Sequence, residues 1–555
     1  MRETIMADDV KRIPVLIVGG GPVGLALAVE LGTRGVRCML VDARDGSVAI
    51  PKMSQVSARS MELCRRWGIV GEIERSGWPN HYPQDFVYVT SLTGYELARS
   101  RWAPYDAGAD RHVTPNGNIQ CPQIFFDPIL RRHAASLPTV DLRYHVRLDS
   151  IADAGDRVRA RVTDIAAGRE EEIVADYLVG CDGADSTVRN GLGIAMLGAG
   201  RLSYSLSVYF RAADLIKVHD KGWARFYRFI DETGHWADLV AIDGAALWRL
   251  TLLGLDRPAD RDGTAVEAIF RRAVGAPFRY EVISILPWER RDLVAAHFGR
   301  GRVFIAGDAA HQLSPTGGLG MNTGVCSAAD LGWKLAAVLA GWGGPHLLDS
   351  YEIERRPVAQ SAVDESTAYY RRTRIFPTGK RVDEDSPEGE AVRRKFADDF
   401  ARLEREGTLY ISEHIKLGYT YEASPICVPD GSKPLEPNGI DYVPNARPGA
   451  RAPHLWLAEG RSILDLFGDG FVLLRLGNRP PAAGALADAA RKRNVPLAVH
   501  DIARPDALAL YQRALVLVRP DGHVAWRGDA LPDDPAALID RVRGATRVAV
   551  TASPG

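Results

Sequence analysis

The chain has 555 residues, of which 46% are hydrophobic and 25% are charged, and its formal net charge is -1. This balance is typical of a soluble globular protein, and at roughly 100–200 residues per domain the length predicts about three domains. A net charge close to zero provides no overall attraction to nucleic acid or to an anionic membrane, so we expect neither as a partner.

Neither a targeting segment nor a membrane span is expected. Residues 1–12 are polar and charged, unlike a signal peptide, and the apolar runs are short and broken by charge. The six cysteines form no CxxC pair and no metal-ligand cluster, so we expect no metal site and small buried thiols. The sequence therefore predicts a protein of the reducing cytoplasm.

A strand, a tight turn, a helix and a second strand are expected within residues 13–45. Val15 to Val18 is wholly apolar, as a buried parallel strand requires, and the turn Gly19-Gly20-Gly21-Pro22-Val23-Gly24 follows it. In such a turn the first glycine permits a tight bend, the second a close approach to a pyrophosphate, and the third the packing of the helix on the strand. Asp42 ends the second strand and can accept hydrogen bonds from a ribose, so the segment predicts dinucleotide binding. Arg44 nearby leaves FAD and NAD(P) both open.

Two later segments also place polar residues directly after a buried strand. Cys181-Asp182-Gly183 follows such a strand, and can be either a structural turn or a cofactor contact. Gly307-Asp308 follows the strand Val303 to Ala306, and the loop Pro315 to Asn322 then opens a long helix. The Asp308 carboxylate can bind a ribityl hydroxyl, and the amino end of the helix would stabilise an anionic reduced flavin. Together the three segments predict one bound FAD.

Sheet structure is expected in the middle of the chain and again near its end. Strands are indicated at 157–162, 172–180 and 204–212, and nine aromatic residues between 204 and 255 predict a sheet-rich second layer. Residues 376–407 are charged and mostly helical or loose, and 423–452 are rich in Pro and Gly, as a linker is. Strands at 471–474 and 514–518, with a turn at 519–523, predict a final unit.

In this order and spacing, the three segments resemble the single-component aromatic hydroxylases of the para-hydroxybenzoate hydroxylase type, over about residues 13–375. Ser57 to Leu63 resembles the helix with the family's flavin-contacting arginine, here Arg59, and Gln123 resembles the flavin-contacting glutamine. Tyr351 to Pro357 resembles the helix after the third segment. The order of parts is most similar to the group A flavoprotein monooxygenases that hydroxylate phenol, 2,4-dichlorophenol, 3-(3-hydroxyphenyl)propionate and polyketides.

The resemblance implies an α/β fold with a Rossmann-like FAD-binding domain, a β-sheet substrate domain and a C-terminal thioredoxin-like domain. The expected boundaries are 1–80, 105–195 and 290–375 for the first domain, 81–104 and 196–289 for the second, 376–444 for a helical segment and linker, and 445–555 for the last. Because no cysteine lies beyond Cys427, the last domain lacks CxxC and cannot perform dithiol chemistry. We expect it to serve in packing or oligomer contact, and a homo-oligomer is left open.

By the same resemblance, cofactor contacts fall on all three segments and on two further residues. The expected set is Gly19, Gly21, Pro22, Val23, Gly24, Asp42, Ala43, Arg44, Arg59, Gln123, Asp182, Gly183, Gly307, Asp308, Pro315, Gly318, Leu319, Gly320, Met321 and Asn322. Lys52 departs from the family, since many relatives have arginine there, and lysine keeps the charge but loses the bidentate fork. The chain has no second strand–GxGxxG–helix unit, so NAD(P)H would bind in a groove.

The resemblance also implies the reaction. NAD(P)H would reduce FAD, O2 would add to the reduced flavin, and the resulting flavin hydroperoxide would hydroxylate a phenolic or polycyclic aromatic substrate. The candidate catalytic residues are Pro315, Gly318 and Asn322 beside the flavin, and Arg225, Tyr227 and His235 in the aromatic layer. Since the sequence shows no obvious cluster of carboxylate-binding arginines, we expect a bulky or weakly charged phenolic substrate.

Other functions fit parts of the sequence. The same motifs are compatible with Baeyer–Villiger insertion of oxygen next to a ketone, or with oxidation of an antibiotic. A flavin-dependent halogenase would carry a Trp-x-Trp-x-Ile-Pro segment, which the sequence lacks. A non-enzymatic FAD-binding sensor, with the last domain as its binding module, is disfavoured by the motifs that face the flavin.

Overall fold

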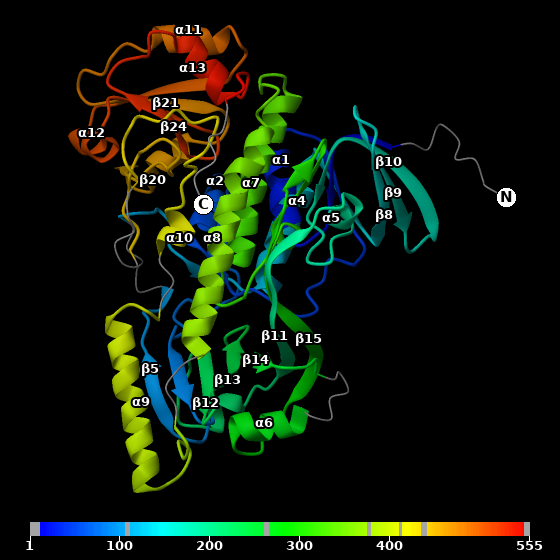
Figure 1. Cartoon of the computed structure of the whole chain (residues 1–555), viewed down its shortest axis with the longest axis vertical. Coiled ribbons are helices and arrows are strands. Elements are labelled where there is room, and N and C mark those ends of the chain that lie inside the picture. The colour runs from blue at the N-terminus through cyan, green and yellow to red at the C-terminus, as the bar shows by residue number, and fades with distance from the viewer. Residues whose placement is uncertain are drawn as a thin grey trace, which may run out of the picture.

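The computed structural model describes residues 11–105, 112–259, 266–374, 379–409, 413–434 and 441–548. Its three large sheets follow one another along the long axis of the molecule (Figure 1). The four-stranded C-terminal sheet lies at the top, the first eight-stranded sheet in the middle, and the second eight-stranded sheet at the bottom. No helix in these ranges is long and apolar enough to cross a bilayer.

The first sheet has a parallel centre in the order β17-β10-β1-β2-β7. These strands are β1 (Lys11–Val18), β2 (Cys38–Asp42), β7 (Val140–Tyr144), β10 (Arg169–Gly180) and β17 (Val303–Ile305). The antiparallel β8 (Val146–Asp153), β9 (Val158–Asp164) and β16 (Gly299–Arg300) extend it. Because parallel strands end at the same edge of a sheet, the segments after β1, β2, β10 and β17 meet there.

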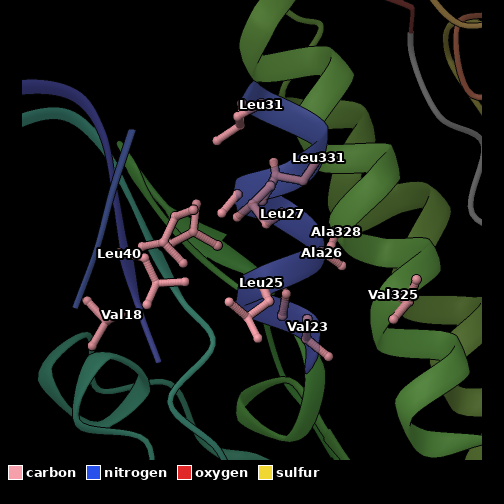
Figure 2. Packing of buried hydrophobic residues seen from close by; sticks show 14 of the residues in the cluster. Val18, Val23, Leu25, Ala26, Leu27, Leu31, Leu40, Val325, Ala328 and Leu331 are labelled. Atoms are coloured by element: carbon pink, nitrogen blue, oxygen red, sulfur yellow. The ribbon is translucent and has the colours of Figure 1, made fainter. Parts of the chain in front are cut away.

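The core of this part lies between the sheet and two closely packed helices, α1 (Pro22–Thr33) and α7 (Gly320–Leu339). Figure 2 shows Leu25 of α1 directed toward the sheet, whereas Ala26 faces Ala328 of α7. Small residues allow this close approach: a Cβ added at Gly332 of α7 would lie 2.5 Å from Cγ of Glu30. The same region contains α2 (Ala58–Arg66), α3 (Val70–Glu74), α4 (Gln123–Ser136), α5 (Thr187–Gly191), α8 (Asp349–Arg374) and the short pair β3 (Gln55–Val56) and β6 (Ile119–Gln120).

The second sheet has the order β18-β15-β11-β14-β13-β12-β4-β5. Its strands are β4 (Phe86–Val89), β5 (Glu96–Ser100), β11 (Met196–Arg211), β12 (Phe226–Asp231), β13 (Gly234–Ala241), β14 (Leu247–Leu255), β15 (Glu281–Ala295) and β18 (His311–Gln312). One face packs on α6 (Val266–Val274) and forms an aromatic core, and α9 (Pro387–Arg405) covers β5. The other face of the sheet is turned toward the first sheet's carboxyl edge.

The C-terminal sheet has the order β22-β21-β23-β24, with β21 (Phe471–Leu476) parallel to β22 (Leu497–Ile502). β23 (Leu515–Val518) and β24 (Val524–Gly528) run antiparallel, and α11 (Gly484–Arg491), α12 (Pro505–Tyr511) and α13 (Pro535–Val542) complete a thioredoxin-like domain. The domain packs on α7, where the rings of Trp333 and Phe471 lie 6.2 Å apart. The expected residue boundaries of the domains are kept as a prediction.

Replacement of Gly24 by alanine should lower the midpoint of thermal unfolding. The new Cβ would lie 2.0 Å from the carbonyl oxygen of Gly19, and such overpacking typically destabilises a protein by about 1–3 kcal/mol. Gly484→Ala is the matched control, because Gly484 also begins a helix but a Cβ there meets nothing within 4 Å. A Gly24→Ala protein as stable as the Gly484→Ala protein would contradict this packing argument.

Candidate active site

One cavity of about 1870 Å³ lies between the first and second sheets and is lined by residues of both. Typical small-molecule sites occupy roughly 300–1,000 Å³, so this cavity has room for a dinucleotide and a second ligand. The three glycine-containing segments line one end of it, and the strands of the second sheet line the other.

The turn after β1 forms one wall through Gly19, Gly21, Pro22 and Val23. Gly19 has φ +110°, and a Cβ there would lie 2.3 Å from the Cys181 carbonyl oxygen, so only glycine fits. A Cβ on Gly21 would meet nothing within 4 Å, because this residue faces the open cavity. Gly24 does not line the cavity, and it permits the helix to pack against the turn, so its cofactor contact stays a prediction.

Asp42, Ala43 and Arg44 continue this wall from the end of β2. The Gly20 amide donates to Oδ2 of Asp42 at 2.6 Å, and the Arg44 amide donates to Oδ1 at 2.7 Å. The carboxylate therefore fixes both turns. The Arg44 guanidinium also donates to its two oxygens at the longer distances of 3.3 and 3.4 Å, and a ribose hydroxyl could replace these weaker contacts.

The second segment, Cys181-Asp182-Gly183, offers its backbone rather than its side chains to a ligand in the cavity. The Asp182 carboxylate caps α5, since it accepts from the Ser186 hydroxyl at 2.5 Å and from the Val188 amide at 3.1 Å. Gly183 has φ +83°, and a Cβ there would meet nothing within 4 Å, so its backbone is open to the cavity.

Gly307 and Asp308 lie at the end of β17, and both line the cavity. The Asp308 side chain is deep in the protein, yet its surface is accessible because it borders the cavity. Burial raises the pKa of this carboxyl above its ordinary value, and the charge of Lys52, which also lines the cavity, acts in the opposite direction. A carboxylate in this position can accept hydrogen bonds from ligand hydroxyls.

The loop before α7 reaches the cavity through Pro315, Gly318, Gly320 and Met321. Leu319 does not: it is buried against Ala362 and Tyr369. Its side chain therefore does not contribute to the predicted cofactor contact, which stays a prediction for its backbone.

Asn322 is also directed away from the cavity, so its predicted catalytic and cofactor roles are not supported. Its side-chain oxygen accepts from the Ser57 amide at 2.9 Å and the Ser60 hydroxyl at 2.8 Å. Its side-chain nitrogen donates to the carbonyl oxygens of Gln55 at 3.2 Å and Gly318 at 2.8 Å. Asn322 thus ties the loop to the beginning of α2.

Gln123 lines the cavity and accepts from the Lys52 amide at 2.9 Å, but Arg59 lies elsewhere. The Arg59 guanidinium is buried, pairs with Glu62 at 3.0 Å and donates to the carbonyl oxygen of Asp521 at 2.6 Å. The side chain of Arg59 therefore faces the C-terminal domain, which does not support the predicted flavin contact, and the contact stays a prediction.

The second sheet separates the three substrate-side candidates. Side chains alternate between the faces of a strand, so Phe226 and Arg228 of β12 line the cavity, whereas Tyr227 between them points into the aromatic core and donates to the Gly222 carbonyl. Arg225 precedes this strand and also lines the cavity. His235 is buried and does not line the cavity, and its Nε2 lies 2.9 Å from Oδ1 of Asp238, which does. Direct catalytic roles for Tyr227 and His235 are therefore not supported.

Most of the expected aromatic lining is on the wrong face as well. Trp223, Phe229, Trp236 and Trp248 pack in the core behind the sheet with Tyr227. The aromatic side chains that do line the cavity come from several elements: Phe86, Tyr88, Trp102, Tyr105, Phe226, Trp288, Tyr369 and Phe400.

Four arginines instead dominate the sheet side of the cavity: Arg225, Arg228, Arg249 and Arg290, here called the arginine quartet. Arg228 and Arg290 are buried, and the other two are half-buried. Burial lowers the pKa of Arg249 and of Arg290 to about 10, and it also lowers the pKa of Arg225. All four remain protonated at neutral pH. The lowered pKa values of Arg225, Arg249 and Arg290 reflect burial with little compensating charge, whereas Arg228 differs: burial acts to lower its pKa, but Tyr88, Tyr369 and Asp238 together raise it above its ordinary value.

The protein offers this quartet little negative charge. Asp238 lies 3.6 Å from Nε of Arg228, and the other carboxylate of strands β12–β15 that lines the cavity, Glu289, pairs with Arg291. The quartet was missed because its members come from different strands. Only the strand register, which places Arg228 beside Asp238 and Arg249 beside Val240, brings them to one face.

The geometry fits FAD at the end of the cavity that the three glycine-containing segments line. An open glycine at the amino end of α1, carboxylates after β2 and β17, and an exposed backbone at Gly183 lie around one continuous cavity. Such an arrangement suits a pyrophosphate, a ribose and a polyhydroxylated chain.

Comparison with known proteins agrees with this geometry. The profile of the FAD binding domain family matches residues 12–366, and that of the aromatic-ring hydroxylase C-terminal domain matches residues 445–546. The chain belongs to the FAD-dependent aromatic-ring hydroxylases. The hydroxylase is thus an oxidoreductase with FAD as its cofactor, and NAD(P)H and O2 are the usual co-substrates of such monooxygenases.

Individual relatives cover nearly the whole hydroxylase. The 4-methyl-5-nitrocatechol 5-monooxygenase of a Burkholderia species is 34% identical over 96% of this chain and 97% of its own. The tetracenomycin B2 monooxygenase-dioxygenase of Streptomyces olivaceus is also 34% identical, over 96% and 98%.

Solved structures show the same fold. The rebeccamycin biosynthetic enzyme RebC, soaked with chromopyrrolic acid and holding 7-carboxy-K252c, superposes with a TM-score of 0.90 at 42% identity, covering 97% of this chain and 100% of RebC. The flavin-dependent monooxygenase PieE, in complex with FAD and substrate, superposes with a TM-score of 0.86 at 30% identity, covering 96% and 99%.

Replacement of Asp308 by asparagine should weaken FAD binding and stabilise the apoprotein. Loss of a charge-assisted hydrogen bond should reduce the affinity for FAD roughly tenfold or more, and quenching of flavin fluorescence measures this affinity. Because the pKa of Asp308 is raised in the folded state above 3.8, its ionised form opposes folding at neutral pH and ceases to do so as the pH falls below about 4.

The thermal midpoint of the Asp308→Asn apoprotein should accordingly exceed that of the wild type at pH 7, and the two midpoints should converge in acid. A variant with unchanged FAD affinity would overturn the assignment of Asp308 as a cofactor-binding carboxylate. A variant less stable than the wild-type apoprotein at pH 7 would contradict the raised pKa of Asp308.

Proposed function

We propose that the hydroxylase oxidises an extended aromatic substrate that carries at least one carboxylate, and that the arginine quartet binds this anion. The observation that carries the proposal is the charge imbalance at the sheet end of the cavity, where four guanidinium groups line the wall and Asp238 lies 3.6 Å from one of them, Arg228. This replaces the expectation of a weakly charged phenol, which rested on the apparent lack of an arginine cluster in the sequence.

Physical chemistry favours an anionic ligand for these side chains. Desolvated cations are unfavourable unless an anion and hydrogen-bond acceptors lie nearby, and arginine matches a carboxylate through two parallel hydrogen bonds. Arg249 donates to the Pro51 carbonyl, and Arg225 donates to the Ser54 hydroxyl at the long distance of 3.4 Å. The Nε atoms of all four members are buried without a hydrogen-bond partner. A bound carboxylate would satisfy some of these donors.

Asp238 does not supply the missing counter-charge and is a poor candidate for a base. Burial acts to raise the pKa of its carboxyl, but the combined effect of His235, Arg228 and Arg290 lowers it below its ordinary value. A carboxylate that stays ionised at neutral pH is a weak proton acceptor, so we propose that Asp238 orients Arg228.

The names of the relatives specify aromatic compounds of different size, a nitrocatechol for one and tetracenomycin B2 for another. RebC, which was soaked with chromopyrrolic acid and holds 7-carboxy-K252c, favours a large substrate with a carboxylate. A cavity of about 1870 Å³ has room for such a ring system beside FAD.

The residues then divide the work. FAD, when bound, supplies the electron transfer and the oxygen chemistry. Asp42 and Asp308 bind its hydroxyl groups, the quartet holds the substrate carboxylate, and Pro315 and Gly318 form the wall where the two ligands meet. Phe226 and Trp288 are apolar walls that exclude water from the ring.

The test is turnover of fused-ring aromatic carboxylic acids and of their methyl esters. The purified FAD-loaded protein should consume O2 and NAD(P)H faster with the acids, and mass spectrometry should find products heavier by one oxygen atom. Esters that match their acids would refute the anion proposal, and product structures would separate ring hydroxylation from Baeyer–Villiger insertion.

Replacement of Arg249 by glutamine should raise the KM for an aromatic acid by about ten- to a hundredfold, because hydrogen bonds to charged groups contribute about 1.5–3 kcal/mol. The KM for the matching ester should change little. Arg211→Gln is the control, since Arg211 belongs to the same sheet but is exposed and pairs with Glu281. Equal changes in KM for acid and ester would show that Arg249 does not bind the carboxylate.

We also propose a cytoplasmic location for this enzyme. All six cysteines are free, and five of them are buried, which suits a reducing compartment. A homo-oligomer is kept as a prediction that the sedimentation coefficient of the purified protein tests.

A further inference from the structure

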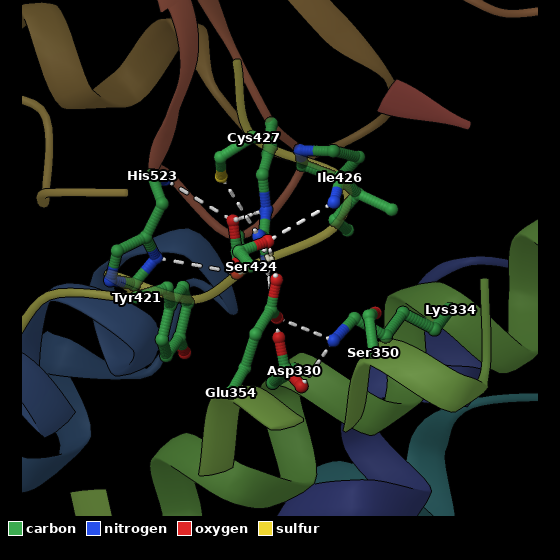
Figure 3. Close-up of polar contacts among 12 residues, drawn as sticks. Asp330, Lys334, Ser350, Glu354, Tyr421, Ser424, Ile426, Cys427 and His523 are labelled. Atoms are coloured by element: carbon green, nitrogen blue, oxygen red, sulfur yellow. Dashed lines mark hydrogen bonds and ion pairs between the residues drawn. The ribbon is translucent and has the colours of Figure 1, made fainter. Parts of the chain in front are cut away.

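The turn Arg519–His523 joins β23 to β24 and contacts the FAD-binding domain through Arg519 and the Asp521 carbonyl. Figure 3 shows His523 of this turn beside Tyr421, with Glu354 and Asp330 of the FAD-binding domain below them. Arg519 is 0% exposed, Asp521 3% and His523 1%. The turn closes on itself, because the Arg519 amide donates to the His523 carbonyl at 2.8 Å and the Gly522 amide donates to the Arg519 carbonyl at 2.9 Å. It is therefore a rigid projection.

Arg519 is bound to α7 and α8 through carboxylates. Its guanidinium donates to both oxygens of Glu354 in α8, at 2.6 and 2.9 Å, and to Oδ1 of Asp330 in α7, at 3.1 Å. Lys334 of α7 donates to the same two carboxylates, at 2.8 Å to Asp330 and 2.6 Å to Glu354. Asp521 of the turn is the remaining anion, 2.6 Å from Arg519. Two cations thus alternate with three carboxylates across the domain interface.

The turn also holds α2 through its backbone. Arg59 donates to the Asp521 carbonyl at 2.6 Å, and Arg66 donates to the Pro520 carbonyl at 2.9 Å. Arg59 also pairs with Glu62, which receives two further hydrogen bonds from Arg451 of the C-terminal region. The C-terminal domain therefore fixes both ends of the face of α2 that is turned toward it.

The helices α2 and α7 determine the shape of the loop Pro315–Gly320, which lines the cavity. The beginning of α2 binds Asn322 in the first turn of α7, through the Ser57 amide and the Ser60 hydroxyl. Asn322 in turn holds the carbonyl of Gly318, which lines the cavity. No described residue beyond Asp441 lines the cavity, so the C-terminal domain influences it only through such contacts.

Arg355 of α8 provides a third connection between the turn Arg519–His523 and the amino end of α7. It donates to the Thr323 carbonyl at 3.1 Å and to the Ser327 hydroxyl at 3.0 Å, both in the first turns of α7. It also donates to the Tyr421 hydroxyl at 3.2 Å, and the ring of Tyr421 lies 4.4 Å from that of His523. The amino end of α7 is thus connected to the same turn from a second side.

We propose that the turn Arg519–His523 is a positioning element for the cofactor, which fixes α2 and α7 so that the loop Pro315–Gly320 keeps the shape that binds FAD. Buried ion networks tolerate little displacement, because a shifted member leaves its partners unpaired and desolvated. The proposal rests on the cofactor contacts argued above and is independent of the substrate.

Conservative variants test the proposal. In Arg519→Lys and Arg59→Lys the charge remains but the forked contacts are lost, and we expect the Kd for FAD to rise about tenfold in each, within the usual range of coupling between sites. Arg527→Lys is the matched control: Arg527 lies in β24, is 5% exposed and binds Asp430 at 2.7 Å, away from α2, α7 and α8. Its Kd should equal that of the wild type.

The outcomes separate the hypotheses. If both variants are less stable but bind FAD as tightly as wild type and the Arg527→Lys protein, the turn only fastens the domains together and the proposal is wrong. If the wild-type protein bound no FAD at all, the cofactor assignment itself would fail.

A measurement on the unaltered chain does not depend on the folding of variants. Coupling is reciprocal, so FAD must stabilise the turn if the turn stabilises the FAD site. Amide hydrogen exchange at residues 519–524 should be slower with FAD than in the apoprotein, by about tenfold, whereas exchange in β22, at the far edge of the same sheet, should not change. Equal exchange rates at 519–524 in the two states would overturn the proposal.

Discussion

A buried guanidinium group is unfavourable unless its charge and its N–H donors find partners, and two groups of buried arginines in this chain differ in how far they do. At the interface with the C-terminal domain, Arg519 is surrounded by Glu354, Asp330 and Asp521. In the cavity, Asp238 lies beside Arg228 and is the nearby carboxylate that also acts on Arg249 and Arg290, whereas Arg225 has no such partner among the residues that affect its pKa. The first arrangement is complete without a ligand and holds domains together. The second is incomplete in the protein alone, which is what a site for an anionic substrate requires.

The fold brings both arrangements to one helix. α7 begins at the cavity, where the loop Pro315–Gly320 forms the wall between the cofactor and substrate ends, and its later turns carry Asp330 and Lys334 into the interface. A structural domain without dithiol chemistry can therefore influence a cofactor that it does not touch. The parallel sheet provides the other fixed point, since β1, β2, β10 and β17 all end at the edge of the cavity.

Local motifs could be predicted from the sequence, and features that depend on strand pairing could not. The turn Gly19–Gly24, the carboxylates Asp42 and Asp308, and the order of the three domains follow from short patterns with a known physical role, and the fold class and family are confirmed. Tyr227 was assigned to the wrong face because one residue of displacement along a strand reverses a side chain. The quartet spans residues 225 to 290 on three strands and the approach to one of them, so no local pattern revealed it. Arg59 and Asn322 were placed at the flavin by resemblance, whereas their hydrogen bonds fix α2 and α7.

The most direct test of the account is a crystal structure of the FAD-loaded protein with a fused-ring aromatic carboxylate. The account predicts FAD along Gly21, Asp42 and Asp308, and the ligand's carboxylate within hydrogen-bond distance of at least two members of the arginine quartet. A ligand whose carboxylate points to solvent, with the quartet unoccupied, would contradict it.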